Sequence, residues 1–150
     1  MYKKSISAKG KGGAELLKPK GIAVCVTRQK TCERLILEGK KRRQTEEPFY
    51  VVNVSPTGWE ILGKKNDDVK EVAEAMEYLF EVSKESGAEM VLIRSTDIID
   101  SIVEFCEKNE IGQVILGCSG KSKEKMEERK EMTEKLKDRL KGQSKVVSLS

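Results

Sequence analysis

The sequence predicts an α/β fold, a three-layer sandwich in which a five-stranded parallel sheet lies between two layers of helices. Five short runs of mainly β-branched and aliphatic residues follow one another along the chain, at 22–27, 49–54, 89–94, 114–116 and 146–149. Segments with apolar residues at helical spacing separate these runs. Strands that alternate with helices pair in parallel through right-handed crossovers, and their helices cover both faces of the sheet. The 150 residues suffice for one domain with its own core.

The N-terminal residues are expected to lie outside that domain. Residues 1–20 contain six lysines, one glutamate and three glycines, with a short apolar island at Leu16 and Leu17. This composition predicts a flexible basic arm, and we place the domain at 21–150.

The first strand and helix are predicted at 22–43. The run 22–27, IAVCVT, is almost continuously apolar, as is typical of a central strand covered on both faces. Thr31 is expected to cap a helix with Cys32, Leu35, Ile36 and Gly39 at helical spacing. The basic residues at 40–43 suit the negative end of the helix dipole, so they need no ligand.

The second strand, 49–54, is expected to end in a turn at 55–58. Trp59, Ile61 and Leu62 follow. They could cover a pocket or plug the edge of the sheet, and we expect the plug. A long helix then starts at Asn66 or Asp67 and is closed by Gly87. Its predicted core stripe is Val69, Val72, Ala73, Met76, Leu79, Phe80 and Ser83.

The last three strands are separated by two more helices. Ser95 or Thr96 is expected to cap the first of them, in which Cys106 is predicted to be a buried small hydrophobe. The second extends to Lys141, is stopped by Gly142, and has a thin apolar side of Met126, Met132, Thr133, Leu136 and Leu140. Its other positions are mostly Glu and Lys, spaced as in a solvated helix.

Composition excludes several classes of function. The net charge of +4 and the seven aromatic residues other than histidine do not suit a nucleic-acid-binding face. Histidine is absent and the four cysteines form no CxxC pair, so we expect no metal. Without histidine, hydrolytic chemistry would need unusual groups. No apolar run is long enough for a membrane span or a secretory signal, and we expect a cytoplasmic protein.

The candidate site is the loop after the fourth strand. Gly117, Cys118, Ser119 and Gly120 are followed by Lys121 and Ser122. Glycines there allow close approach to a ligand, and successive N–H groups attract phosphate oxygens. A plain turn with solvated charges explains the same residues. In doubly wound sheets ligands bind where the winding reverses, which selects the loops at 27–31 and 117–121.

Two segments resemble the universal stress protein family, and most closely the stress-protein-like domain of Kdp potassium-sensor histidine kinases. They are VCVTRQKTCERLI, near the first strand, and AEMVLIRSTDIIDSIVEFCEKNEIGQVILGCSGKS, which spans the third and fourth strands. The resemblance implies a strand order of 3-2-1-4-5 and an adenine-nucleotide cleft at the switch point. It also implies a homodimer formed through the last strand, Val146 to Leu149, and a sensor kinase or other protein as a partner.

The family's nucleotide motif is only half present. Nucleotide-binding members have Gly-x-x-Gly, nine residues, and then Gly-Ser or Gly-Thr. Gly117 and Gly120 match the first half, whereas Lys130 and Glu131 stand where the second half should be. Thr133 matches a hydroxyl position just after the motif.

The resemblance also assigns residues near the first two strands. Val54 falls where family members offer backbone groups to adenine. Thr27 and Arg28 replace the acidic residue that ATP-binding members place after the first strand. Some Kdp-sensor domains bind cyclic di-AMP with residues at this place, where this chain has Thr27, Arg28, Gln29, Lys30 and Thr31, which could act similarly; Arg28 and Lys30 would counter phosphate charge.

Two interpretations remain open. The first is a non-catalytic sensing domain that binds ATP, cyclic di-AMP or another adenine nucleotide beyond the first and fourth strands. The second is a protein-interaction or dimerisation module that has lost nucleotide binding, which Lys130 and Glu131 favour. Slow ATP hydrolysis and redox sensing through Cys32 and Cys118 rank behind both.

Overall fold

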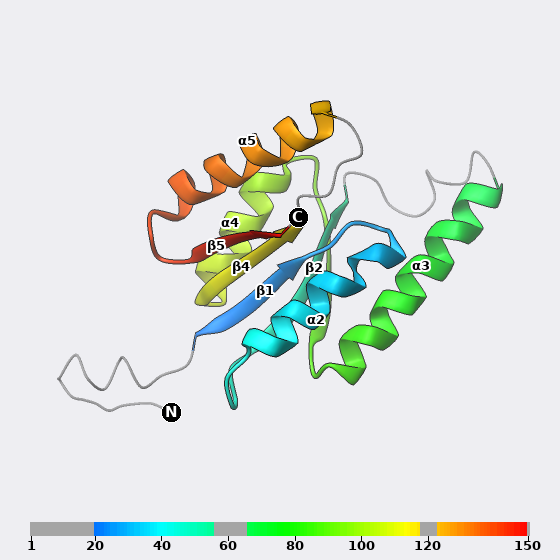
Figure 1. Ribbon diagram of the computed structural model, residues 1–150, viewed down its shortest axis with the longest axis horizontal. Coiled ribbons are helices and arrows are strands. Elements are labelled where there is room, and N and C mark those ends of the chain that lie inside the picture. The colour runs from blue at the N-terminus through cyan, green and yellow to red at the C-terminus, as the bar shows by residue number, and fades with distance from the viewer. Residues whose placement is uncertain (1–19, 56–65, 118–122, 150) are drawn as a thin grey trace.

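The computed structural model describes residues 20–55, 66–117 and 123–149. Its five strands form one parallel sheet in the order β3-β2-β1-β4-β5, which confirms the predicted fold class and strand order (Figure 1). The strands are β1 (Gly21–Cys25), β2 (Phe49–Ser55), β3 (Glu89–Arg94), β4 (Ile111–Gly117) and β5 (Lys145–Leu149). The helices are η2 (Lys30–Cys32, a 3₁₀ turn), α2 (Glu33–Arg42), α3 (Asn66–Glu85), α4 (Ile98–Lys108) and α5 (Lys123–Leu140).

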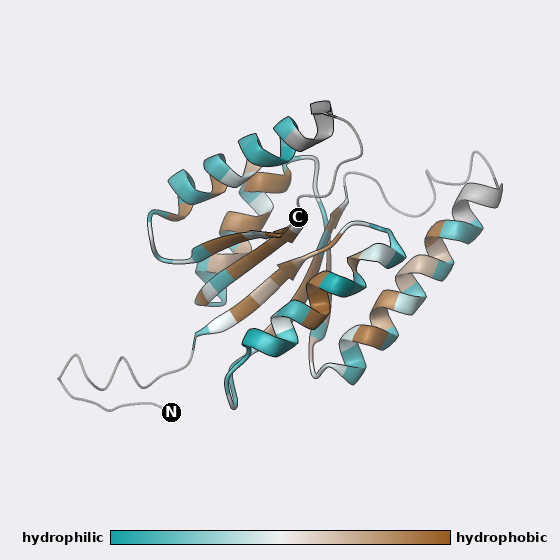
Figure 2. Ribbon diagram, viewed as in Figure 1, coloured by the Kyte–Doolittle hydropathy of each residue, from teal (hydrophilic) through white to brown (hydrophobic). Residues whose placement is uncertain are grey.

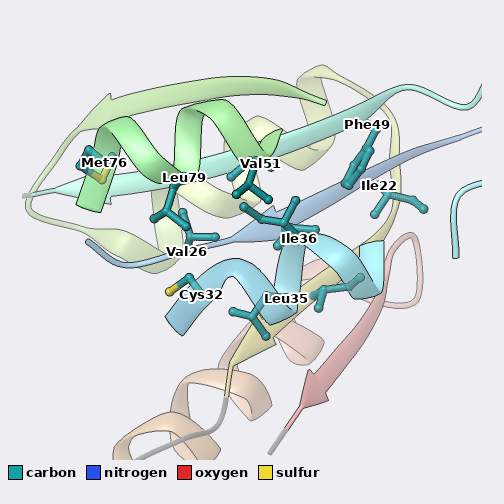
Figure 3. Close-up of a cluster of buried hydrophobic side chains, with 12 residues drawn as sticks. Ile22, Val26, Cys32, Leu35, Ile36, Phe49, Val51, Met76 and Leu79 are labelled. Carbon is teal, nitrogen blue, oxygen red and sulfur yellow. The ribbon is translucent and has the colours of Figure 1, made fainter. Parts of the chain in front are cut away.

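The helices pack on the sheet in two layers, each over its own apolar core. On one face, α2 and α3 cover a cluster that includes Ile22, Ile36, Val51, Leu79 and Ile115 (Figure 3). On the other face, α4 and α5 cover Ala23, Val52, Val114, Leu116 and Leu136, among others. Consecutive strand residues thus point to opposite faces, and both faces are apolar because both are buried. Figure 2 shows mostly hydrophobic strands, a mostly hydrophilic α5, and α2, α3 and α4 with residues of both kinds.

The register of the sheet places the ends of β1 and β4 side by side. Cys25 pairs with Leu116, so the residues after Cys25 leave the sheet next to Gly117. The chain continues from β1 to β2 on one side of β1, whereas β4 pairs with the other side of β1. The direction of winding therefore reverses between β1 and β4. This is the switch point at which ligands bind in such sheets.

Two helices end where glycine was predicted to end them. Gly87 follows α3 with a φ of 80°, and Gly142 follows α5 with a φ of 81°. Both values lie in the left-handed region that glycine adopts without a steric penalty.

Both predicted helix caps were wrong. Thr31 lies inside η2, and the residue before α2 is Cys32, whose side chain makes no capping hydrogen bond. For α4, the cap is Asp97 rather than Ser95 or Thr96, and its carboxylate accepts a hydrogen bond from the Asp100 N–H at 2.9 Å. An aspartate is as good a cap as a hydroxyl residue, so composition alone could not decide among these neighbours.

The extents of several elements also differ from prediction, and β1 ends at Cys25 rather than at 27. β2 includes Ser55, which was expected to start a turn, and β4 begins at Ile111 rather than at 114. In α3, Phe80 is 51% exposed and Ala73 is also exposed, although both were predicted in the core. The predicted Met76, Leu79 and Ser83 are buried, and Ala75 and Val82 complete the inward stripe. The predicted plug at Trp59, Ile61 and Leu62 lies outside the described residues.

Helix α2 approaches the sheet closely at Gly39. A Cβ atom at this position would lie 2.6 Å from Val24 Cγ2 and 2.8 Å from Phe49 Cε1. The absence of a side chain therefore lets the helix backbone pack directly on β1 and β2. Within the described parts of the chain, none of the helices is long and apolar enough to cross a membrane.

Candidate functional site

A small cleft lies beyond the carboxyl ends of β1 and β4. The segment after β1 contributes Thr27, Gln29 and Thr31 to its walls. The start of α2 contributes Cys32, Arg34 and Leu35. Cys25, Gly117 and Arg129 complete the lining. The cavity volume is about 30 Å³, which corresponds to about two water molecules. The cleft thus joins the two loops that the sequence selected, and it is narrow.

Contacts between Thr27 and Cys32 fix the loop after β1. The Thr27 N–H donates to Cys32 Sγ at 3.3 Å, and the Thr27 hydroxyl lies 3.3 Å from the same sulfur. Cys32 is buried, with 7% of its surface exposed, and its N–H donates to Gln29 O at 3.0 Å. Cys32 therefore shapes the cleft from within the core instead of offering an exposed thiol.

An amide side chain on β2 supports the same loop. Asn53 is buried, and its Nδ2 donates to Val26 O at 3.0 Å. Val26 N in turn donates to Val52 O at 2.9 Å. These bonds extend the pairing of β1 and β2 beyond Cys25 and hold Thr27 at the cleft.

Gly117 has a packing role as well as its place at the cleft. A Cβ atom on Gly117 would lie 3.0 Å from Leu35 Cδ1, which is tighter than ordinary contact. Its carbonyl oxygen accepts a hydrogen bond from Arg129 Nη1 at 3.1 Å. The glycine is therefore needed for α2 to pack at the end of β4, whether or not a phosphate binds there.

Arg129 lines the cleft, a position that sequence reasoning did not predict. It projects from α5 to the end of β4, and Thr133 Oγ1 donates to its carbonyl oxygen at 2.8 Å, one turn along the helix. In the sequence, Arg129 is only the last of the nine residues between the two halves of the family motif. Nothing in that spacing indicates that its guanidinium reaches the cleft.

The start of α5 explains the departure from the family motif. The helix begins at Lys123, so Lys130 and Glu131 lie in its interior. Backbone N–H groups in a helix interior donate to carbonyl groups four residues earlier and are not offered to a phosphate. In this chain the first turn of the helix directly follows 118–122.

The remaining predicted site residues are dispersed. Thr27, Thr31 and Gly117 line the cleft. Arg28 follows Thr27 in the sequence and is half-buried, but it is not part of the lining. Val54 packs against the core under α4 and α5, and the hydroxyl of Thr133 bonds to its own helix. Ser119, Gly120, Lys121 and Ser122 lie outside the described residues.

Two thiols, Cys25 at the end of β1 and Cys106 on α4, are held in the protonated form. Burial, with a smaller contribution from Cys106, raises the pKa of Cys25 far above its ordinary value, although Arg129 lowers it. Burial and the nearby Glu107 raise the pKa of Cys106 to about 12. Thiols in this state are poor nucleophiles and poor metal ligands. Among the described residues, no three Cys, Asp or Glu side chains are grouped as metal ligands.

Comparison with known proteins identifies the fold. No known protein-family profile and no curated protein matches the chain. Among solved structures, a universal stress protein from Archaeoglobus fulgidus is similar, with a TM-score of 0.55 and 21% identity over 92% of this chain and 98% of that chain. The A. fulgidus universal stress protein in complex with dAMP gives a TM-score of 0.57 and 21% identity over 87% and 98% of the two chains.

A third similar structure is that of the protein MJ0577, with a TM-score of 0.56 and 17% identity over 87% of this chain and 94% of that chain. These similarities extend over nearly the whole of both chains in each pair. The chain therefore has the universal stress protein fold.

Proposed function

We propose that the chain is a non-catalytic, cytoplasmic regulatory domain that senses an adenine nucleotide, ATP or cyclic di-AMP, in the cleft beyond β1 and β4. The main support is the meeting of Thr27, Gly117 and Arg129 in one cleft at the switch point of the sheet. A second support is the similar A. fulgidus universal stress protein, whose structure is of a complex with dAMP. In this proposal Arg28, Val54 and residues 119–122 surround the ligand, as the family resemblance implies.

The described residues suit one phosphate group better than an extended phosphate chain. The guanidinium of Arg129 has five N–H donors, so its bond to Gly117 O leaves donors for a phosphate oxygen. Thr27 and Thr31 add hydroxyl groups, and Arg34 lines the same cleft. Because Lys130 and Glu131 lie within α5, the second phosphate-binding element of the family motif is replaced here by Arg129.

Entry of a nucleotide requires the cleft to widen. A space of about 30 Å³ is far too small for a purine nucleoside. One contact across the cleft is the hydrogen bond between Arg129 and Gly117, and a long side chain can change rotamer without moving its helix. Thr133 would then act by bonding to the Arg129 carbonyl oxygen and not by touching the ligand.

Calorimetric titration of the protein with AMP, ATP and cyclic di-AMP tests this proposal. Arg129→Ala should weaken binding of the phosphate-bearing ligands by about 10-fold to 100-fold, the value of a charge-assisted hydrogen bond. Adenosine affinity should change little. Arg139→Ala is the matched control, because Arg139 lies on the same helix but bonds to Asp100 at 2.7 Å. Absence of heat and of any thermal shift at millimolar ligand would refute nucleotide sensing.

The alternative is an interaction module that has lost nucleotide binding, and the closed cleft favours it. In that case Arg129 substitutes for a ligand by bonding to Gly117 O. The two proposals predict different effects of Arg129→Ala on nucleotide binding. Removal of a ligand-binding arginine weakens binding, whereas removal of a side chain that merely fills the cleft leaves binding absent or creates it.

We also propose that two copies associate through β5, as the resemblance to Kdp sensor domains implies. β5 is an edge strand, paired with β4 on one side, and Val146, Val147 and Leu149 on it are only partly buried. An edge strand offers N–H and C=O groups to another strand. Light scattering of the protein and of a Val147→Pro variant tests this arrangement. A wild-type monomer would leave a sensor kinase or another protein as the candidate partner.

A further inference from the structure

A second and larger cavity, of about 270 Å³, lies at the other end of β4 from the cleft. Cys106, Ile111 and Leu140 form part of its lining, and each is only 2% exposed. Gln143 and Ser144, in the turn between α5 and β5, line it as well. The cavity therefore has an apolar floor that none of the residues proposed for nucleotide binding shares.

The lining of this cavity carries two carboxylates and one lysine, Lys20. Glu107 and Glu110 lie on its lining, at the end of α4 and just after it. α4 ends at Lys108 and α5 ends at Leu140, so both helices direct their C-terminal ends, with their partial negative charge, to this side of the sheet. An occupant should therefore combine an apolar part with a positive charge.

The chain enters the domain beside this cavity. Lys20 is part of the lining, and its side-chain stem lies along Gly112. A Cβ atom on Gly112 would come within 2.8 Å of Lys20 Cβ and 3.5 Å of its Cδ. The glycine thus leaves room for Lys20 and fixes where the preceding residues begin.

The residues before Lys20 have the composition that the cavity requires. The arm has one pair of adjacent leucines, Leu16 and Leu17, and a lysine, Lys18, follows it directly. Leu17 is three residues from Lys20, so its Cα lies within about 11 Å of the Lys20 Cα even in a fully extended chain. A connection this short corresponds to a local concentration on the order of millimolar, which favours contact even for a weak site.

We propose that the cavity is the docking site of the chain's own basic arm. Leu16 and Leu17 pack on the floor formed by Cys106, Ile111 and Leu140, and Lys18 pairs with Glu107 or Glu110. The arm then anchors to the end of the domain opposite the cleft.

Zero-length carbodiimide cross-linking of the full chain, followed by peptide mass spectrometry, tests the docking. This reagent joins an amine to a carboxylate only where the two are in contact. We expect amide bonds from Lys18 to Glu107 or Glu110, and bonds from Lys20 to the same glutamates serve as a positive control. The doubly substituted variant Leu16→Asp, Leu17→Asp should lose the Lys18 cross-links. The control Ile6→Asp, Ala8→Asp adds the same charge elsewhere in the arm and should keep them.

Three results would overturn the proposal. The first is formation of Lys20 cross-links without Lys18 cross-links in the wild-type chain. The second is equal loss in both variants, which would show that the leucines have no special role. The third is a cross-link between light and ¹⁵N-labelled chains in a mixed sample, which would mean that the arm docks on a second copy.

Discussion

Substitution of Gly39 by alanine tests how closely α2 packs on the sheet beside the cleft. Two effects oppose each other in this variant. Alanine is favoured over glycine in a helix interior by about 1 kcal/mol. The added methyl group, however, would lie 2.6 Å from Val24 Cγ2 and 2.8 Å from Phe49 Cε1, about 1 Å closer than carbon atoms normally approach.

The clash should exceed the gain in helix propensity. Val24 is fully buried and Phe49 is 3% exposed, so neither side chain has free space to move into. Overpacking of this kind costs about 1–3 kcal/mol, and the close approach to two side chains favours the upper end. We expect Gly39→Ala to lower the free energy of unfolding by about 2 kcal/mol, which corresponds to a fall in Tm of about 4–8 °C.

A double-mutant cycle with Val24→Ala gives the sharpest form of this test. Removal of the two Val24 methyl groups opens space for the alanine and for the Phe49 ring. In urea unfolding, Gly39→Ala should therefore be much less destabilising in the Val24→Ala background than in the wild-type protein. A stabilising effect in the wild-type protein, or an equal loss in both backgrounds, would refute the packing argument.

Three other predictions follow from individual side chains. Burial raises the pKa of Cys106 from 9.0 to about 12, so the folded protein retains a proton that the unfolded chain releases above pH 9. The difference in unfolding free energy between wild type and Cys106→Ala should therefore fall by about 1.4 kcal/mol between pH 8 and pH 10. A difference that stays constant in urea unfolding would contradict this. Asn53→Leu removes the donor to Val26 O and should lower the free energy of unfolding by about 1–3 kcal/mol in the same assay. A loss no larger than that of a substitution at an exposed position, such as Lys41→Leu, would show that the hydrogen bond contributes little to stability. Thr133→Val should lower the free energy of unfolding by about 1 kcal/mol or less, because the Thr133 hydroxyl bonds to a helix carbonyl oxygen that already has a partner. In calorimetry this variant should lose far less nucleotide affinity than Arg129→Ala. An equal loss would place Thr133 in contact with the ligand.

The fold was predictable because its main determinant is periodicity. Strand runs such as 22–27 are apolar on both faces, and the helices between them show stripes of buried residues. The order of the strands is a different matter, since alternation alone does not specify it. That order was predicted from the resemblance to a known family and is confirmed by the hydrogen-bonded pairs.

One misplaced boundary and one wrong core assignment have physical causes in single residues. The start of β4 was set too late because Gly112 interrupts the apolar run, and that glycine is explained by its contact with Lys20, which is distant in sequence. Phe80 was assigned to the core from its type, although it lies beside the inward stripe of α3 and is half exposed.

The candidate site was only half predictable. Thr27, Thr31 and Gly117 could be placed together because they follow strands that end at the same edge of the sheet. Arg129 could not, because its position depends on where α5 begins and on the direction of a long, flexible side chain. The family motif directs attention to the residues just after Arg129, which lie in the helix interior.

Titration of ¹⁵N-labelled protein with AMP, ATP and cyclic di-AMP, followed by two-dimensional NMR, tests the central claim most directly. The proposed function predicts that one or more of these ligands causes saturable shifts of the amide signals of Thr27, Thr31, Gly117 and Arg129. Little change is expected at Ile111 and Ser144, which line the cavity at the opposite end of β4. Unchanged spectra with all three ligands at millimolar concentration, or shifts confined to the opposite end, would contradict a nucleotide site beyond β1 and β4.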